Sequence, residues 1–407
     1  MTPALRPSPA LEWRFALSEE LLVKGFIALT PFMIFVAVQC VHAQTMLYSV
    51  RLQDYGYVRN NAHFNKVEPD SALTKKIGID GSGRVYVGFS VRGEPKLHER
   101  GEASNIFRVL SVNPLKQRVE RTLDFPTQSM KRVGVYVTTT DALLVAANDR
   151  LQLLGESGTA TATYDAPPIL SKYVNTWIVE QSPSGKTLLF RPDDHTLSFI
   201  STESLSPIAR CKLTDPRNDY DTFNDSMMVK VYQIDYAPSN ELVKAELCGT
   251  SERLWYLGGQ LYYPFFLDET TLLETEFTPS PGWDIAVQKT DGKILWTDRM
   301  PGPFEIVSYG GFFTSARDGS RFAITVNEIH RGNSALMINS KIVSVSVVIY
   351  DARTGEKKGQ VKFQKPNSFI GYELALSPTG DMLAILKDDM LEVWKVQEGG
   401  PGLSALQ

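Results

Sequence analysis

Short apolar segments alternate along the chain with turns rich in serine, proline, glycine, asparagine and aspartate. From Ala43 onward, a strand, a turn, a second strand, another turn and a third strand recur, and no stretch has the spacing of an amphipathic helix. Two copies of the pattern align without a gap, one from Trp177 to Phe190 and one from Tyr372 to Ile385. The pattern predicts an all-β fold built from repeats.

The first turn of the repeat carries the clearest signal. Ser182-Pro-Ser-Gly185 and Ser377-Pro-Thr-Gly380 share it, and each serine lies 11 residues before an aspartate pair, Asp193-Asp194 or Asp388-Asp389. Glycine suits the turn because it adopts a left-handed backbone at no steric cost. Fainter copies of the turn occur at Asp80 to Gly83, Thr139 to Asp141, Ala237 to Asn240, Asp268 to Thr270 and Arg317 to Gly319.

Seven copies of this turn predict seven repeats. The span from Ser82 to Thr379 gives an average of about 50 residues per repeat, which is within the range of β-propeller blades. The intervals are uneven, so six or eight blades also fit. We predict a single seven-bladed β-propeller over residues 44–407.

The two ends of this region complement each other. The last repeat supplies three strands before the glycine-rich end at Gly399 to Gly402, whereas Thr45 to Arg51 alternates like a strand and has no repeat of its own. A propeller closes into a ring that leaves no sheet edge open. We therefore predict that the N-terminal strand completes the last blade.

Residues 1–43 are interpreted as a signal peptide. Lys24 precedes an apolar stretch from Gly25 to Cys40, and Val41 and Ala43 occupy the −3 and −1 positions of a cleavage site. The stretch is shorter than the roughly 20 residues of a spanning helix, although a retained anchor is the alternative. We expect cleavage after Ala43, a secreted or periplasmic protein, and no stable membrane span in the mature chain.

Composition narrows the function classes. Hydrophobic residues make up 43% of the chain, which is enough for a large core. The net charge is −4 and basic residues form no long run, so we expect no nucleic-acid partner. Loss of Cys40 with the signal leaves Cys211 and Cys248, in neighbouring repeats. In an oxidising compartment they form a disulfide or remain two buried thiols, and both alternatives stay open.

Three segments resemble the bacterial WD-repeat-like propellers, a group that includes the propeller of the periplasmic Tol system. They are Leu376 to Ala384, Ser182 to Lys186 and Ile349 to Glu356. The likeness extends from about Ile77 to Val396 and implies an architecture, not an activity. The aspartate of a Trp-Asp repeat is missing after Trp394 and no repeat opens with Gly-His, so the partner mode of WD repeats is not carried over.

Two acidic clusters are candidates for metal binding. Asp193, Asp194 and His195 combine carboxylates with an imidazole. Met390 replaces the histidine in the matching repeat, so we interpret the aspartates as a turn. The segment from Asp215 to Asp225 collects oxygen atoms suited to calcium, but it lacks the helix-loop-helix pattern and is interpreted as a solvated loop. We expect no metal and no cofactor.

No catalytic set emerges from the motifs. A lactonase-like hydrolase or lyase, the alternative function, needs acids and a histidine on first strands, which here offer only Glu180 and Glu373. Thr290 to Trp296 resembles one blade of a quinoprotein dehydrogenase, and its single copy is interpreted as packing between blades. The aromatic stretch from Trp255 to Phe266 is interpreted as strands of the core.

We predict a non-enzymatic, monomeric module that binds a protein or peptide. In the repeat register, the long insertions Arg92 to Glu102, Asp215 to Asp225 and Asn327 to Lys341 share one face of the propeller, and long loops often carry function. Insertions without a function are the alternative. The candidate binding residues are His98, Arg100, His330 and Arg331.

Overall fold

A computed structural model describes most of the chain after Ala43. The described residues are 44–57, 76–91, 105–127, 133–165, 180–193, 196–212, 219–226, 228–232, 240–246, 250–256, 261–277, 282–301, 304–307, 313–330, 341–364, 372–387 and 389–397.

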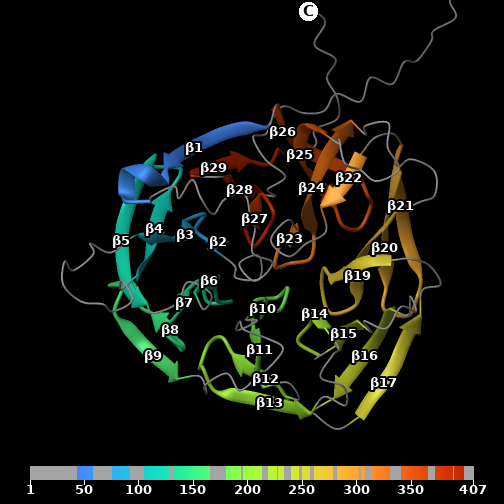
Figure 1. Cartoon of the computed structure of the whole chain (residues 1–407), viewed down its shortest axis with the longest axis horizontal. Coiled ribbons are helices and arrows are strands. Elements are labelled where there is room, and N and C mark those ends of the chain that lie inside the picture. The colour runs from blue at the N-terminus through green and yellow to red at the C-terminus, as the bar shows by residue number, and fades with distance from the viewer. Residues whose placement is uncertain are drawn as a thin grey trace, which may run out of the picture. The chain divides into compact units, whose positions relative to one another are not determined.

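These residues form an all-β propeller of antiparallel sheets (Figure 1). Among the described residues, six sheets have four strands and one has five. Sheets 1 to 3 contain β2 (Ile77–Ile79), β3 (Val85–Val91), β4 (Asn105–Asn113) and β5 (Arg118–Thr127); β6 (Gly134–Val137), β7 (Leu143–Ala147), β8 (Arg150–Leu154) and β9 (Ala160–Asp165); and β10 (Glu180–Gln181), β11 (Thr187–Asp193), β12 (Thr196–Ser201) and β13 (Pro207–Lys212).

The remaining sheets follow the same order. Sheet 4 contains β14 (Asp219–Phe223), β15 (Met228–Tyr232), β16 (Asn240–Glu246) and β17 (Thr250–Tyr256), and sheet 5 contains β18 (Leu261–Phe266), β19 (Thr271–Phe277), β20 (Gly282–Lys289) and β21 (Ile294–Pro301). Sheet 6 contains β22 (Phe304–Val307), β23 (Phe313–Ser315), β24 (Arg321–His330), β25 (Lys341–Asp351) and β26 (Lys357–Gln364). Sheet 7 contains β27 (Glu373–Leu376), β28 (Met382–Lys387), β29 (Met390–Lys395) and β1 (Thr45–Arg51).

In six sheets, the turn between the first two strands lies where the sequence predicts it. In sheet 4 the predicted position is wrong. There the turn is Asn224–Ser226, whereas Asn240 begins β16. The supposed acidic loop from Asp215 to Asp225 also contains strand β14, whose Phe223 is buried. Asparagine, aspartate and serine form this turn without the proline and glycine that mark the clear copies, so the sequence signal was weaker.

The prediction that Thr45–Arg51 completes the last sheet is confirmed. Strand β1 pairs antiparallel with β29, from Thr45 opposite Lys395 to Arg51 opposite Met390. A short 3-10 helix, Leu52–Tyr55, follows it, and the Leu52 amide donates to the Asp389 carbonyl at 2.7 Å. The N-terminal segment is therefore part of the ring.

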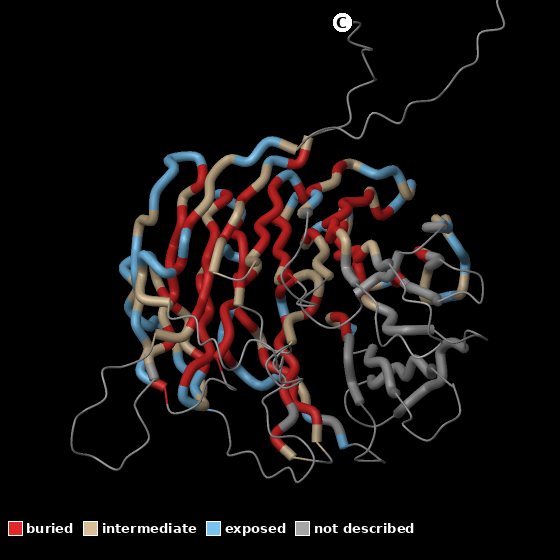
Figure 2. Tube along the Cα trace, turned by 45° about the horizontal axis from the view of Figure 1, so that its top comes forward, coloured by how far each residue is buried: buried red, intermediate tan, exposed pale blue. Residues whose placement is uncertain are grey.

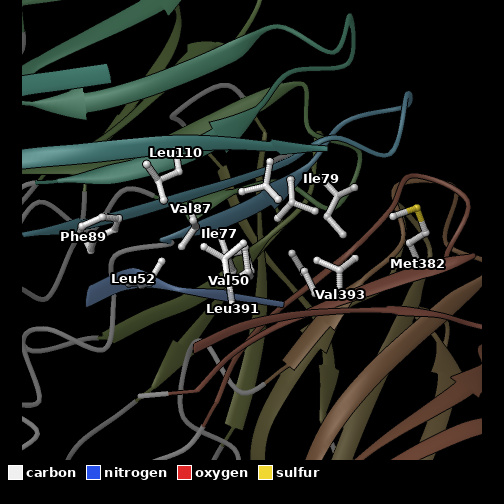
Figure 3. Packing of buried hydrophobic residues seen from close by; sticks show 14 residues of the cluster. Val50, Leu52, Ile77, Ile79, Val87, Phe89, Leu110, Met382, Leu391 and Val393 are labelled. Atoms are coloured by element: carbon white, nitrogen blue, oxygen red, sulfur yellow. The ribbon is translucent and has the colours of Figure 1, made fainter. Parts of the chain in front are cut away.

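The N-terminal segment Thr45–Tyr55, which we name the clasp, is also packed against buried side chains (Figure 3). Val50 and Leu52 lie among buried side chains of sheets 1 and 7, including Ile77, Val87 and Leu391. Apolar groups are also buried between sheets 1 and 2, 2 and 3, 5 and 6, and 6 and 7. Figure 2 shows buried residues along many of the described strands.

Trp296 confirms the interpretation of its segment as packing between blades. Its ring stacks on Phe322 and Tyr350 of sheet 6 at centroid distances of 6.1 and 5.9 Å, and its Nε1 donates to the Ala352 carbonyl at 2.8 Å. Gly355 adopts φ +74°, and a Cβ there would lie 2.7 Å from the indole. A glycine in this turn thus leaves room for the tryptophan of the neighbouring sheet. Trp255 to Phe266 also lies mainly in strands, β17 and β18, as predicted.

We expect Leu52→Ala to lower the free energy of unfolding by about 2–4 kcal/mol, because it leaves a cavity between sheets 7 and 1. Chemical denaturation measures the loss. The exposed neighbour provides the control, since Gln53→Ala should change stability by less than about 0.5 kcal/mol. Equal effects of the two substitutions would contradict the docking of this segment.

Candidate functional site

The antiparallel order of the strands gives the propeller two different faces. Turns between first and second strands, and between third and fourth strands, lie at one end of every sheet, which we name the turn face. Connections between second and third strands, and the links from one sheet to the next, lie at the other end, which we name the loop face. Of the three predicted insertions, Arg92 to Glu102 and Asn327 to Lys341 fall in loop-face connections. The segment from Asp215 to Asp225 does not belong to that face as a whole, because it contains β14 and reaches the turn-face turn at Asn224–Ser226.

On the turn face, polar groups join neighbouring sheets. Ser184 of sheet 3 donates to the Asp225 carboxylate of sheet 4. The backbone amides of Asp225 and Ser226 donate to the Glu269 carboxylate of sheet 5 at 2.8 and 3.0 Å, and the Asn224 side chain donates to the Glu269 carbonyl at 3.0 Å. Charged acceptors strengthen these bonds.

Similar contacts continue around the turn face, and together we name them the turn ring. The glycine of the sheet 6 turn, Gly319, lies against Asp268 of sheet 5, and the glycine of the sheet 1 turn, Gly83, lies against Met382 of sheet 7. The other links are hydrogen bonds from Asp318 N to Pro378 O at 3.2 Å, Gly81 N to Asp141 Oδ1 at 2.8 Å, and Gln181 Nε2 to Val137 O at 2.7 Å.

Arg317 crosses the axis of the turn ring. Its guanidinium, carried by sheet 6, donates to the Thr138 carbonyl and the Asp141 carboxylate of sheet 2, both at 2.5 Å. Its Cδ lies 3.2 Å from the position that a Cβ on Gly185 of sheet 3 would take. Sheets 6 and 2 are not neighbours in the ring (Figure 1), so this side chain links opposite sides of the propeller. The described polar groups of the turn face thus hold the sheets to one another.

Sheet 6 contains the longest strand among the described residues. Its β25 has 11 residues, and β22 pairs with the far half of β24 while β23 pairs with the near half. The predicted insertion from Asn327 to Lys341 begins too early, because Asn327 to His330 are the last residues of β24. Near this end, the buried Ser344 hydroxyl donates to Glu328 Oε2 at 2.7 Å, and Lys362 Nζ lies 3.3 Å from the same oxygen.

An aromatic pair lies between sheets 6 and 7 at the loop-face end. The rings of Phe363 and Tyr372 meet edge to face at 4.9 Å. Lys387 Nζ lies 4.6 Å from the Phe363 ring centroid and 5.8 Å from that of Tyr372, within the range of cation–π attraction. This part of the loop face combines a positive charge with the partly exposed Phe363 ring, whereas Tyr372 is buried in the core.

The inner strands contribute a salt bridge between sheets 7 and 1. Lys76 Nζ lies 3.2 Å from Glu373 Oε1, and the Lys76 amide donates to the other carboxylate oxygen at 3.2 Å. Burial, with a smaller contribution from Glu180 and Glu373, raises the pKa of the Tyr136 phenol and keeps it protonated. Glu180 and Glu373 do lie on first strands, as predicted. The ion pair of Glu373 leaves it poorly suited to the acid–base role that a lactonase-like site requires.

These groups form one region, which we name the loop-face arc. It runs from sheet 6 through sheet 7 to sheet 1, and the two insertions with the candidate binding residues begin at its ends. His330 ends β24, opposite Lys341, whereas His98, Arg100 and Arg331 lie outside the described residues. The arc consists of Glu328, Ser344, Lys362, Phe363, Tyr372, Lys387, Glu373 and Lys76.

Two other candidate sites are only partly described. Asp193 ends β11 and Thr196 begins β12, so the aspartate pair does lie at a connection between two strands, with Asp194 and His195 outside the described residues. Cys211 lies in β13 and Cys248 is outside the described residues, so the disulfide stays a prediction. Within the described ranges there is no group of three or more metal-ligating side chains and no helix long and apolar enough to cross a membrane.

Comparison with known proteins adds little beyond the fold. No family model matches the chain, and no curated protein matches it. It is similar to the solved WD40 domain of Neurospora crassa Pan2 (9% identity, TM-score 0.46, 88% of this chain and 96% of that one) and to the WD40 domain of Toxoplasma gondii coronin (10%, 0.46, 80% and 82%). A chain of the Mitotic Checkpoint Complex is also similar (12%, 0.47, 87% and 96%). The fold assignment therefore rests on the order of the sheets.

Arg317→Ala should lower the free energy of unfolding by about 1–2 kcal/mol, because it removes hydrogen bonds of a half-buried charged group that connects distant sheets. A double-mutant cycle with Asp141→Asn should give a coupling energy of at least about 0.5 kcal/mol.

The matched control is the exposed pair Arg150 and Asp165, also 2.5 Å apart but within sheet 2. Its coupling should lie near zero, because solvent screens it and the pair joins neighbouring strands. A coupling for Arg317 and Asp141 no larger than that of the control would contradict the link across the axis.

Proposed function

We propose that this chain is an exported seven-bladed β-propeller that binds a protein or peptide on its loop face. One observation carries the proposal: the polar groups of the turn face join the sheets to one another, whereas the loop face has the long connections and the arc. Each sheet corresponds to one blade, with the extra strand of sheet 6 formed by a break between β22 and β23.

The chemistry of the loop-face arc favours a polypeptide. Protein interfaces combine aromatic anchors with charged groups at the rim. Phe363 is partly exposed and packs edge to face on the buried Tyr372, and Lys387, Lys362 and Glu328 provide both signs of charge beside it. His98, Arg100, His330 and Arg331, from the connections at the two ends of the arc, are the residues that we expect to add specificity.

Removal of a signal peptide is compatible with the position of strand β1. Strand β1 begins at Thr45, so cleavage after Ala43 would leave the closing strand intact. The mature protein would then fold in the periplasm or outside the cell. The resemblance to the Tol-like propellers fits this location and remains a prediction.

The test replaces residues 97–100 and 331–337 by short Gly-Ser links in the exported protein. A partner identified by crosslinking to the unmodified protein should bind the variant at least tenfold more weakly, because three of the four specificity residues, His98, Arg100 and Arg331, are gone. The melting temperature should not change. Surface plasmon resonance measures the affinity, and N-terminal sequencing of the same preparation should begin at Gln44.

A matched change on the turn face serves as the control. Glu156→Gly together with Ser157→Gly alters the exposed turn between β8 and β9 and should leave the affinity unchanged. Lys387→Gln tests the described part of the arc and should weaken binding by about tenfold. Full affinity in both the loop replacement and Lys387→Gln would refute the proposed binding face.

A further inference from the structure

The outer strands of the seven described sheets differ in how they protect the edge of the sheet. An outer strand pairs on one side only, so backbone amides and carbonyls on its other side can pair with a further strand. Natural sheets oppose such pairing with bulges, charged residues and proline at the edge. A bulge interrupts the pairing of every outer strand, namely β5, β9, β13, β17, β21, β26 and β1. Charge and proline therefore distinguish a protected edge from an open one.

Five of the outer strands carry a basic residue in their interior. These residues are Arg121 in β5, Arg210 in β13, Arg253 in β17, Arg299 in β21, and Lys358 and Lys362 in β26. Strands β5, β13 and β21 also contain a proline. Strands β9 and β1 have neither a proline nor a charge in their interior. Only these two edges therefore lack both forms of protection.

Strand β9 is the more accessible of the two. Four of its six residues are exposed, and its sequence is Ala-Thr-Ala-Thr-Tyr-Asp from Ala160 to Asp165. In β1, by contrast, residues 47–49 are half-buried and Val50 is buried. Strand β9 lies at the outside of the ring in Figure 1. A further strand can therefore approach sheet 2 along β9.

The rest of sheet 2 holds β9 in a fixed register. Residues 162–165 pair without interruption with residues 150–153 of β8. The bulge lies at the other end of β9, where the Thr161 hydroxyl donates to the Leu153 carbonyl at 3.1 Å. The Tyr164 ring contacts Phe190 of sheet 3 edge to face at a centroid distance of 6.0 Å. The open edge is thus a preformed template, and its alanines and threonines leave room for larger side chains on an added strand.

Acidic groups lie at both ends of this edge. Residues 142–165 contain the acids Asp149, Glu156 and Asp165 but a single base, Arg150. Glu156 is exposed in the turn before β9, and the Asp165 side chain at the other end is 72% exposed, although Arg150 lies 2.5 Å from it. In an antiparallel pairing of two copies of this chain, Asp165 of each copy would lie beside the Glu156 turn of the other, and like charges oppose pairing. The charge therefore favours a basic strand over a second copy.

We propose that β9 accepts an extended, positively charged segment of a partner polypeptide as an additional strand of sheet 2. Main-chain hydrogen bonds hold the segment along β9, and basic side chains at its two ends meet Glu156 and Asp165. This site lies on the rim of the propeller, so it is separate from the loop face and does not depend on the function proposed there.

Hydrogen exchange of the full chain in the presence of a synthetic peptide tests the proposal. The probe is acetyl-Lys-Thr-Val-Thr-Val-Thr-Lys-amide, which is extended, uncharged in its interior and basic at both ends. One control peptide has every interior amide N-methylated, which removes the donors of a β-ladder. A second control peptide has glutamate in place of both lysines.

The probe should bind with a dissociation constant below about 1 mM. Bound probe should slow exchange within Ala160–Asp165 at least about threefold and leave β5 and β13 unchanged, because only β9 gains hydrogen bonds. The N-methylated peptide should give no protection. The glutamate peptide should bind at least about threefold more weakly, since each exposed ion pair contributes up to about fivefold.

Two matched variants of the protein test the edge itself. Thr163→Lys places a charge inside β9 at an exposed position and should weaken binding of the probe at least about fivefold. Thr122→Lys makes the same change at an exposed position of β5 and should leave the affinity unchanged. Equal melting temperatures of the two variants and the unmodified chain check the fold.

Three results would overturn the proposal: no slowing of exchange in β9 at probe concentrations up to about 1 mM, equal protection by the N-methylated peptide, or equal loss of affinity in Thr163→Lys and Thr122→Lys. Sedimentation velocity without peptide provides a further check. A dimer that forms at high protein concentration and is abolished by Thr163→Lys would identify a second copy as the occupant and would contradict the basic partner.

Discussion

The pairing of β1 with β29 is the interaction on which the rest of the structure depends. A ring of sheets has no open edge only when the two ends of the chain meet in one sheet. Here the last sheet takes three strands from the C-terminal end and one from Thr45–Arg51. Val50 and Leu52 then bury the junction between sheets 7 and 1, so the hydrogen bonds and the apolar core close at the same place.

Closure fixes the position of every sheet and so divides the chemistry between two faces. Turns that are held against their neighbours can use their carboxylates as acceptors, as Asp225 and Glu269 do, and Arg317 can reach across the axis to Asp141. Groups committed to such bonds are not available to a partner. The loop face has longer connections and retains the aromatic pair and the charges beside it, which is why recognition is assigned there.

Most of the fold could be predicted from the sequence because the repeat has a local signal. Glycine after serine and proline marks a tight turn, and alternation marks the strands, so the ring and its closing strand followed from short segments. The turn of sheet 4 was missed because Asn224, Asp225 and Ser226 lack that signal, and the neighbouring Ala237 to Asn240 imitates it.

The site was less predictable. Lys76 and Glu373 meet across 297 positions of sequence, and Lys387 meets Phe363 only through the packing of sheets 6 and 7. No local pattern encodes such contacts, because they depend on the register between sheets and on closure of the ring. For the insertions with His98 and His330, the sequence shows only that the connections are long. The length of a connection indicates an exposed surface but does not identify the ligand.

Native-state hydrogen exchange of β1 tests the central claim most directly. If β1 closes the ring, the hydrogen-bonded amides of Thr45–Arg51 and of Met390–Lys395 should exchange with the same free energy of opening as those of β7 and β24, close to that of global unfolding. Exchange of the β1 amides at a much lower free energy, while β7 and β24 stay protected, would show that the N-terminal strand detaches by itself and would contradict the account.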